Sequence, residues 1–263
     1  MKTELENKVA IVTGGASGIG KATVENLLEE GAIPILIDKD RQKGERFSHF
    51  LADSETEHLF IHADLTHDEN CKVAVRHVID KYKRIDVLIN NAGGNDFLDI
   101  DTTSPKEFRE SLERNLVHYY TMTHYSWPYL KESRGNVIFV GSKVALVGEG
   151  KTTAYAAAKG GCIGLTRELA TKSAKENLGI RVNCVLPGEV RTPLYEAYVQ
   201  THFDNPEDGY NKLAHRVPFG RRPTKPEEVA YTIVFLASNR LAGHITGQLI
   251  SPDGGYVHID RNI

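Results

Sequence analysis

Short apolar runs alternate along the chain with longer segments in which apolar residues recur every three or four positions. The short runs lack a strict alternation of apolar and polar residues, which is typical of parallel strands that are covered on both faces. Seven runs are predicted to be strands: 9–12, 33–37, 59–61, 87–89, 137–140, 182–186 and 249–250. Most of them run directly into an acidic, asparagine or glycine residue.

The longer segments predict helices over 18–30, 67–83, 104–127, 154–177 and 224–238. Gly31 suits the position after the first helix, and Ser104 with Pro105 has the form of a capping box. Pro128 is expected to kink or end the third helix, and Thr224 opens the last with a Thr-x-x-Glu box. Repeated strand–helix alternation predicts an α/β fold, a Rossmann-type doubly wound parallel sheet of about seven strands with helices on both faces.

No linker, repeat or low-complexity stretch divides the chain, so residues 1–263 are expected to form a single domain. The least regular segment, 188–222, holds three prolines and several aromatic residues. Such a long irregular segment inside a compact domain is usually functional, which predicts a substrate-binding loop or lid. A surface insertion with short helices is the alternative.

Composition excludes several classes of protein. The 32 basic and 35 acidic residues give a net charge of −3, which offers no electrostatic reason for a nucleic acid or anionic membrane partner. No apolar run reaches the roughly 20 residues that span a bilayer, and the polar start is unlike a secretory signal. Cys71, Cys162 and Cys184 are dispersed, so we expect a reducing, cytoplasmic location. The histidines show no metal-ligand spacing, so no metal is expected.

A glycine cluster connects the first predicted strand to the first helix. Gly14, Gly18 and Gly20 would allow the backbone to approach a pyrophosphate at the helix N-terminus. Asp38 ends the second strand, where a carboxylate can accept from a ribose 2′-hydroxyl and repel a 2′-phosphate, which favours NAD over NADP. A P-loop also fits part of this spacing, but Ala22 stands where that motif needs Ser or Thr.

Three residues further along suggest acid–base chemistry. Tyr155 and Lys159 are four residues apart in a predicted helix and therefore share a face. A nearby ammonium is expected to lower the pKa of the phenol, which could then act as general acid or base. Ser142 ends a predicted strand and could hold the oxygen of a reacting alcohol or carbonyl.

Together these motifs resemble the classical short-chain dehydrogenase/reductase family over residues 5–256. The resemblance rests on Thr13-Gly14-x-x-x-Gly18-x-Gly20, Asp64-Leu65, Asn90-Asn91-Ala92-Gly93, Asn115, Ser142, Tyr155-x-x-x-Lys159 and Pro187-Gly188 followed by Thr192. It implies an NAD-binding catalytic domain in which Tyr155 is the acid/base, Lys159 tunes it and binds ribose, Ser142 orients substrate and Asn115 anchors a relay water.

The resemblance also implies a set of cofactor-binding residues. They are Gly14, Ser17, Gly18, Ile19, Gly20, Asp38, Asp64, Leu65, Asn91, Ala92, Gly93, Tyr155, Lys159, Pro187, Gly188, Val190 and Thr192. Ser17 occupies the position where NADP-preferring members often carry a basic residue, so NAD is the expected cofactor and NADP the less favoured one. Homo-oligomers, usually tetramers, are typical of the family, and the tail 258–263 is expected near a subunit boundary.

Mostly polar residues are expected to face the substrate, which favours a small polyhydroxylated molecule. The predicted substrate residues are Asn95, Ser142, Lys143, Glu149, Tyr155, Glu189 and Tyr195, with Gly94 and Arg191 nearby. Segments 111–116, 118–120, 192–196 and 254–261 resemble the L-fucose dehydrogenase-like branch of sugar dehydrogenases. This implies oxidation of an aldose such as L-fucose to a lactone. A 3-oxoacyl-(acyl carrier protein) or other carbonyl reductase, and a non-catalytic NAD-binding regulatory protein, remain alternatives.

Overall fold

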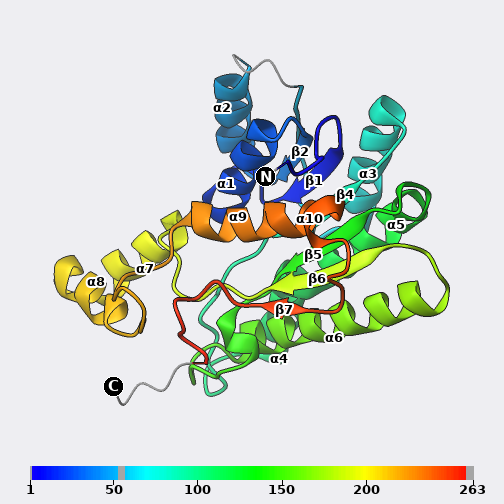
Figure 1. The fold of residues 1–263 in the computed structure, drawn as a ribbon. Helices are drawn as coiled ribbons and strands as arrows, with labels where there is room; N and C mark the ends of the chain where they lie inside the picture. The colour runs from blue at the N-terminus through cyan, green and yellow to red at the C-terminus, as the bar shows by residue number, and fades with distance from the viewer. Residues whose placement is uncertain (1, 53–56, 259–263) are drawn as a thin grey trace.

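A seven-stranded parallel sheet with the strand order β3-β2-β1-β4-β5-β6-β7 forms the centre of the molecule (Figure 1). The computed structural model describes residues 2–52 and 57–258. The strands are β1 Val9–Thr13, β2 Ile33–Asp38, β3 Leu59–His62, β4 Val87–Asn90, β5 Asn136–Val140, β6 Arg181–Val185 and β7 Leu249–Ile250. All seven predicted strands and the predicted fold class are confirmed. The direction of winding reverses between β1 and β4, which opens a crevice at their carboxyl ends.

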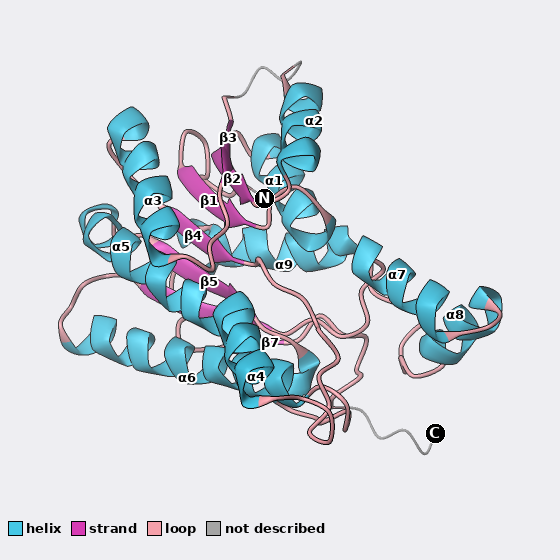
Figure 2. Cartoon of the chain, turned by 180° about the vertical axis from the view of Figure 1, so that it is seen from behind, coloured by secondary structure: helices cyan, strands magenta, loops and turns pink. Residues whose placement is uncertain are grey.

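Helices cover both faces of the sheet (Figure 2). One face carries α1 Gly18–Glu29, α2 Arg41–Leu51 and α9 Pro226–Ala237, and the other carries α3 Asp68–Tyr82, α5 His118–Ser133 and α6 Thr153–Lys175. Each side has its own apolar core, which explains why the strands are apolar on both faces. The short α10, Asn239–Ala242, follows α9, and α4, Pro105–Leu112, packs beside α6.

The helices differ from the prediction in three respects. The predicted helix 104–127 is divided into α4, a π-helical turn η1 over Glu113–Val117, and α5, which continues through Pro128 to Ser133. The last predicted cap is displaced by one residue, because Glu228 accepts from the backbone N–H of Lys225 at 2.8 Å. Helix α2 was not predicted, although Asp40 caps it and its apolar face is buried.

The segment 188–222 contains two short helices, α7 Pro193–His202 and α8 Pro206–Ala214, which project from the main body (Figures 1 and 2). Tyr195, Val199 and Leu213 form a small apolar cluster that holds the two helices together. The alternative of short helices therefore describes its local structure, and its role as a substrate lid stays a prediction. In the tail, residues 259–263 lie outside the described part of the chain, so the expected subunit contact is not described.

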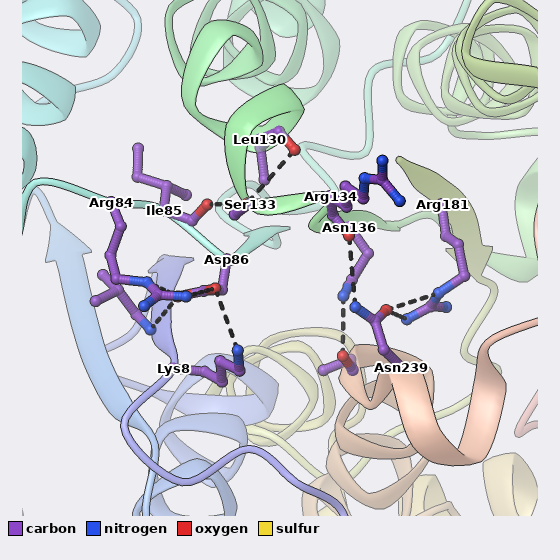
Figure 3. Close-up of polar contacts among 12 residues, drawn as sticks. Lys8, Arg84, Ile85, Asp86, Leu130, Ser133, Arg134, Asn136, Arg181 and Asn239 are labelled. Atoms are coloured by element: carbon purple, nitrogen blue, oxygen red, sulfur yellow. Dashed lines mark hydrogen bonds and ion pairs between the residues drawn. The ribbon is translucent and has the colours of Figure 1, made fainter. Parts of the chain in front are cut away.

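The amino edge of the sheet is closed by structural polar contacts (Figure 3). Asp86 accepts from Arg84 at 2.6 and 2.8 Å and from the backbone N–H of Val9 at 2.9 Å. On the neighbouring side, Arg181 donates to Asn239 at 2.9 and 3.0 Å. These contacts tie strands to strands and to the end of α9. Within the described residues, no helix combines the length and apolar character needed to cross a membrane.

Candidate active site

A cavity of about 770 Å³ lies at the carboxyl ends of the strands, where the winding of the sheet reverses. The loops after six strands contribute to its wall. The predicted site residues that line it are Gly14, Ser17, Gly18, Ile19, Asp38, Asp64, Leu65, Asn91, Ala92, Gly93, Asn95, Ser142, Lys143, Glu149, Tyr155, Lys159, Pro187, Gly188, Glu189, Val190, Thr192 and Tyr195. Three expected residues, Gly20, Asn115 and Arg191, are outside this lining. The side chain of Arg191 instead pairs with Glu196 at 2.7 Å on the surface.

The glycine cluster is required by close backbone contacts. Gly14 has a φ of +65°, and a Cβ there would lie 2.9 Å from the Cα of Ala92. A Cβ at Gly20 would lie 2.1 Å from the carbonyl oxygen of Gly14, so Gly20 allows α1 to approach the loop without lining the cavity. Asn91 donates to the carbonyls of Thr13 at 2.9 Å and Gly14 at 3.3 Å, which fixes the loop against the end of β4.

The N-terminus of α1 points its first backbone N–H groups towards the cavity. Ser17 occupies the N-cap position, but its hydroxyl makes no capping hydrogen bond, and the first turn holds no acidic residue. The N–H groups of the first turn and the positive end of the helix dipole are therefore available to an anion. This donor set, together with the close backbone at Gly14 and Gly18, fits the pyrophosphate of a dinucleotide.

Asp38 lines the same cavity and is held beside the glycine loop. Its carboxylate accepts from the backbone N–H of Ala16 at 3.1 Å and of Asp40 at 3.0 Å, so its position is fixed by the main chain. Three basic residues near Asp38 could compete for a phosphate. Arg41 contacts His62 at 3.1 Å instead. Lys39 and Lys43 line the cavity, and Lys43 pairs with Asp40 at 2.9 Å.

Ser142 and Tyr155 lie together in the reacting part of the cavity. Ser142 follows β5 and precedes the short 3-10 helix η2, Lys143–Ala145, while Tyr155 lies in the first turn of α6. A hydrogen bond joins the two side chains, but desolvation in the cavity outweighs it and raises the pKa of Tyr155 above its usual value. The net pKa of Tyr155 is therefore raised, and the expected lowering by Lys159 stays a prediction.

The ammonium of Lys159 is hydrogen-bonded to groups other than Tyr155. It lies 5.6 Å from the centre of the Tyr155 ring and donates to the hydroxyl of Tyr119 at 3.0 Å and the carbonyl of Val140 at 2.9 Å. Burial lowers its pKa, because the low dielectric disfavours the charged form. Tyr119 is a contact that the sequence did not predict.

Asn115 is fully buried in the π-helical turn η1. Its side-chain oxygen accepts from the backbone N–H of Gly94 at 2.9 Å, and its nitrogen donates to the carbonyl of Ser111 at 3.1 Å. The side chain thus fastens the loop after β4 to α4. Its expected role in a water relay stays a prediction.

Lys143 forms a charged cluster beside Ser142. The side chain is 5% exposed, and its ammonium lies 2.7 Å from Glu149 and 2.5 Å from Glu189. The ring of Tyr256 covers the same ammonium at 3.7 Å. Burial alone would lower the pKa of Lys143, but the two carboxylates outweigh it and hold this pKa above its usual value.

Apolar side chains also line the cavity, and they were not expected from the sequence. Phe97, Leu194, Tyr198 and Leu213 line the cavity, and the rings of Phe97 and Tyr198 stack at 4.9 Å. The aromatic residues of 188–222 could have indicated that Tyr198 lines the cavity. The sequence around Phe97 gives no comparable indication. The cavity is therefore lined by both polar and apolar side chains.

Comparisons with known proteins agree with this geometry. The profile of the short chain dehydrogenase family matches residues 8–202. The chain is 36% identical over 256 residues to an L-fucose dehydrogenase of Bos taurus, covering 97% of this chain and 91% of that protein. It is 37% identical over 259 residues to a 3-oxoacyl-(acyl carrier protein) reductase of Thermotoga maritima, covering 96% and 99%.

The crystal structure of the Cj0485 dehydrogenase superposes with a TM-score of 0.93 at 42% identity, covering 100% of this chain and 99% of that one. The similarity therefore extends over the sheet, the glycine loop and the α7–α8 arm. With the cavity at the switch point of the sheet and the Ser142–Tyr155–Lys159 arrangement, these matches show that the chain belongs to the short-chain dehydrogenases, oxidoreductases that use a nicotinamide cofactor.

Proposed function

We propose that this protein is an NAD-dependent dehydrogenase of an uncharged sugar or polyol, with an aldose such as L-fucose oxidised at C1 to the lactone as the best candidate. The observation that carries the proposal is the cluster beside Ser142 in which the buried ammonium of Lys143 pairs with Glu149 and Glu189. The relatives named L-fucose dehydrogenase support the same substrate class.

The charge of the cluster favours a neutral substrate rich in hydroxyl groups. One ammonium and two carboxylates leave a net charge of −1 at the wall of the cavity. Hydroxyl groups can donate to the carboxylate oxygens that Lys143 does not use, whereas an anionic substrate would be repelled in this partly desolvated site. Burial of Lys143 fixes both carboxylates, so their orientation is set before the substrate binds.

Apolar side chains in the same cavity suit an apolar group on the substrate. Phe97, Leu194 and Tyr198 line the cavity together with the carboxylates of Glu149 and Glu189. L-Fucose carries a methyl group at C6 and hydroxyls along the rest of its ring, so it offers groups of both kinds. This combination of lining residues supports a deoxy sugar over a fully hydroxylated one.

The cofactor preference follows from Asp38. Its carboxylate, oriented by two backbone N–H groups, can accept from a ribose 2′-hydroxyl and would repel a 2′-phosphate. Arg41 is engaged by His62, so it is not directed at a phosphate there. We therefore infer NAD as the cofactor.

Side chains of this protein carry out the proton transfer of the reaction. A bound nicotinamide cofactor would supply the hydride acceptor for the carbon that carries the reacting hydroxyl. Ser142 orients that hydroxyl, and Tyr155 removes its proton as the carbonyl forms. Lys159 supplies positive charge behind Tyr155, which offsets the desolvation that disfavours the phenolate. Loss of hydride and proton together converts the hemiacetal of an aldose into a lactone.

A 3-oxoacyl-(acyl carrier protein) reductase is the second candidate, favoured by the 37% identity to the Thermotoga maritima enzyme. The apolar side chains of the cavity could accept an acyl chain. The negative charge at Glu149 and Glu189 opposes it, because the carrier's phosphopantetheine is anionic. A non-catalytic NAD-binding regulatory protein would have no chemical need of Ser142, Tyr155 and Lys159 together.

The deciding experiment is a substrate panel with NAD and NADP. It contains L-fucose, its stereoisomers, other aldoses and polyols, and in the reductive direction a 3-oxoacyl thioester. We expect turnover of L-fucose or a near stereoisomer with NAD, and a large loss of kcat/KM in Glu189→Gln. The surface variant Glu196→Gln, which lies outside the cavity lining, is the matched control. Turnover of the thioester alone would eliminate the sugar proposal.

We also infer a homo-oligomer, by family resemblance a tetramer, in the cytoplasm. Tyr120 on α5 and Tyr231 on α9 are 53% and 59% exposed, and large apolar side chains at such positions support contacts with further copies. Unpaired, buried cysteines support a reducing compartment. Light scattering of the purified protein tests the oligomeric state, and a monomer would refute it.

A further inference from the structure

Lys159 is a buried residue whose ammonium, within the described residues, donates to two neutral acceptors. Among the described residues, no carboxylate forms an ion pair with it, and its ammonium donates to the Tyr119 hydroxyl and the Val140 carbonyl at 3.0 and 2.9 Å. We propose that Tyr119 is a positioning residue that holds the Lys159 ammonium in place behind Tyr155. The proposal rests on the proposed dehydrogenase function and adds a residue to its machinery.

The local fold explains how Tyr119 reaches this place. It is the second residue of α5, directly after the π-helical turn η1. A π-helical turn closes its hydrogen bonds over five residues instead of four, so it changes the direction of the side chains that follow it relative to a continuous α-helix. The ring then lies against β5, stacked on Phe139 with centroids 5.9 Å apart.

The contacts of Tyr119 suit a fixed hydrogen-bond acceptor. Its side chain is fully buried, and its hydroxyl donates to the Val140 carbonyl at 3.2 Å. The lone pairs of the same oxygen therefore remain for the Lys159 ammonium. Burial raises the pKa of Tyr119 well above its usual value, so this phenol stays neutral and does not exchange protons with substrate.

Removing the Tyr119 hydroxyl is expected to change the pKa of Tyr155. A buried ammonium that loses one of two acceptors is less stable as a cation and less fixed in position. Weaker positive charge near Tyr155 raises the pKa of its phenol. Oxidation requires the deprotonated form, so the activity would then appear at higher pH.

Other titratable groups face the pair and must be accounted for. Cys162 on α6, Cys184 on β6 and His118 on α5 lie around Lys159, while Glu149 and Asp96 act on Tyr155. Burial raises the pKa of both thiols and lowers that of His118 to about 4. We assign an alkaline limb of the rate profile to Tyr155, the proposed general base, together with the neighbouring Lys159.

The test compares the pH dependence of kcat in the wild-type protein, Tyr119→Phe and the control Tyr82→Phe. Tyr82 lies far along α3 and its hydroxyl bonds to Glu57. In Tyr119→Phe we expect the rising limb of oxidation to move up by about one pH unit. At neutral pH we expect kcat to fall about tenfold, with the KM for substrate changed less than about twofold. Tyr82→Phe should match the wild type.

A second pair of variants separates hydrogen bonding from packing. Tyr119→Gln retains an oxygen that can accept from the ammonium, whereas Tyr119→Leu, of similar size, does not. Equal rates and pH profiles in this pair, or an unmoved limb in Tyr119→Phe, would overturn the role of Tyr119.

These outcomes are distinguishable from failure of the proposed function. If the wild-type protein oxidises none of the sugars and reduces the 3-oxoacyl thioester, the sugar proposal fails. The same variants can then be compared on the thioester, where Tyr155 donates the proton and the pH limb reports the same pair. The role of Tyr119 would be judged on that substrate.

Discussion

His118 should make the folded protein sensitive to mild acid. It is 3% exposed at the start of α5, its Nε2–H donates to the Arg114 carbonyl at 3.0 Å, and the charge of Lys159 lies nearby. Burial, assisted by that charge, lowers its pKa from 6.5 to about 4. Below pH 6.5 His118 therefore becomes protonated in the unfolded chain, whereas in the folded chain it becomes protonated only near pH 4. The full difference corresponds to about 3 kcal/mol of stability, lost as the pH falls through this window.

Urea unfolding at two pH values measures this loss. Between about pH 7.5 and about pH 4.5, the wild-type protein should lose about 2.5 kcal/mol more of its free energy of unfolding than His118→Gln does. The same carboxylates titrate in both proteins, so their contribution to the pH dependence of the free energy of unfolding cancels in this comparison. His49→Gln, an exposed histidine at the end of α2, is the matched control and should behave like the wild type. Equal losses in wild type and His118→Gln would refute the account of a histidine buried in its neutral form.

Three further predictions concern the cofactor, the reaction and the fold. Tyr155→Phe should abolish turnover while NADH binding, followed by fluorescence, stays nearly intact; retained turnover would refute its acid/base role. Asp38→Ala should raise kcat/KM with NADP relative to NAD, and an unchanged ratio would count against recognition of the 2′-hydroxyl. Arg181→Met should lower the free energy of unfolding by about 3 kcal/mol, because the Leu236 carbonyl at the end of α9 and the Asn239 side-chain oxygen lose a buried donor. Arg222→Met, which breaks an exposed pair with Glu228, should cost less than about 1 kcal/mol in the same urea experiment.

The architecture and much of the cofactor groove could be predicted from the sequence. Apolar runs without alternation identified all seven strands, because strands buried on both faces need apolar residues throughout. The glycine loop was predicted because close backbone contact, as at Gly14 and Gly20, excludes a Cβ. The missed helix α2 has a weaker pattern, since only Gly44, Phe47 and Leu51 of its residues are buried.

What the sequence determined by itself were features encoded within a few neighbouring residues: strand composition, caps, the glycine turn and the four-residue spacing of Tyr155 and Lys159. Only the tertiary structure determines which side chains that are distant in sequence lie in contact and are buried together. It brought Tyr256 over Lys143, placed Tyr119 behind Lys159, and brought Phe97 to the lining of the cavity. Hydrogen bonding and desolvation depend on these juxtapositions, so the ionisation of Tyr155 and Lys159 could not be inferred from their spacing.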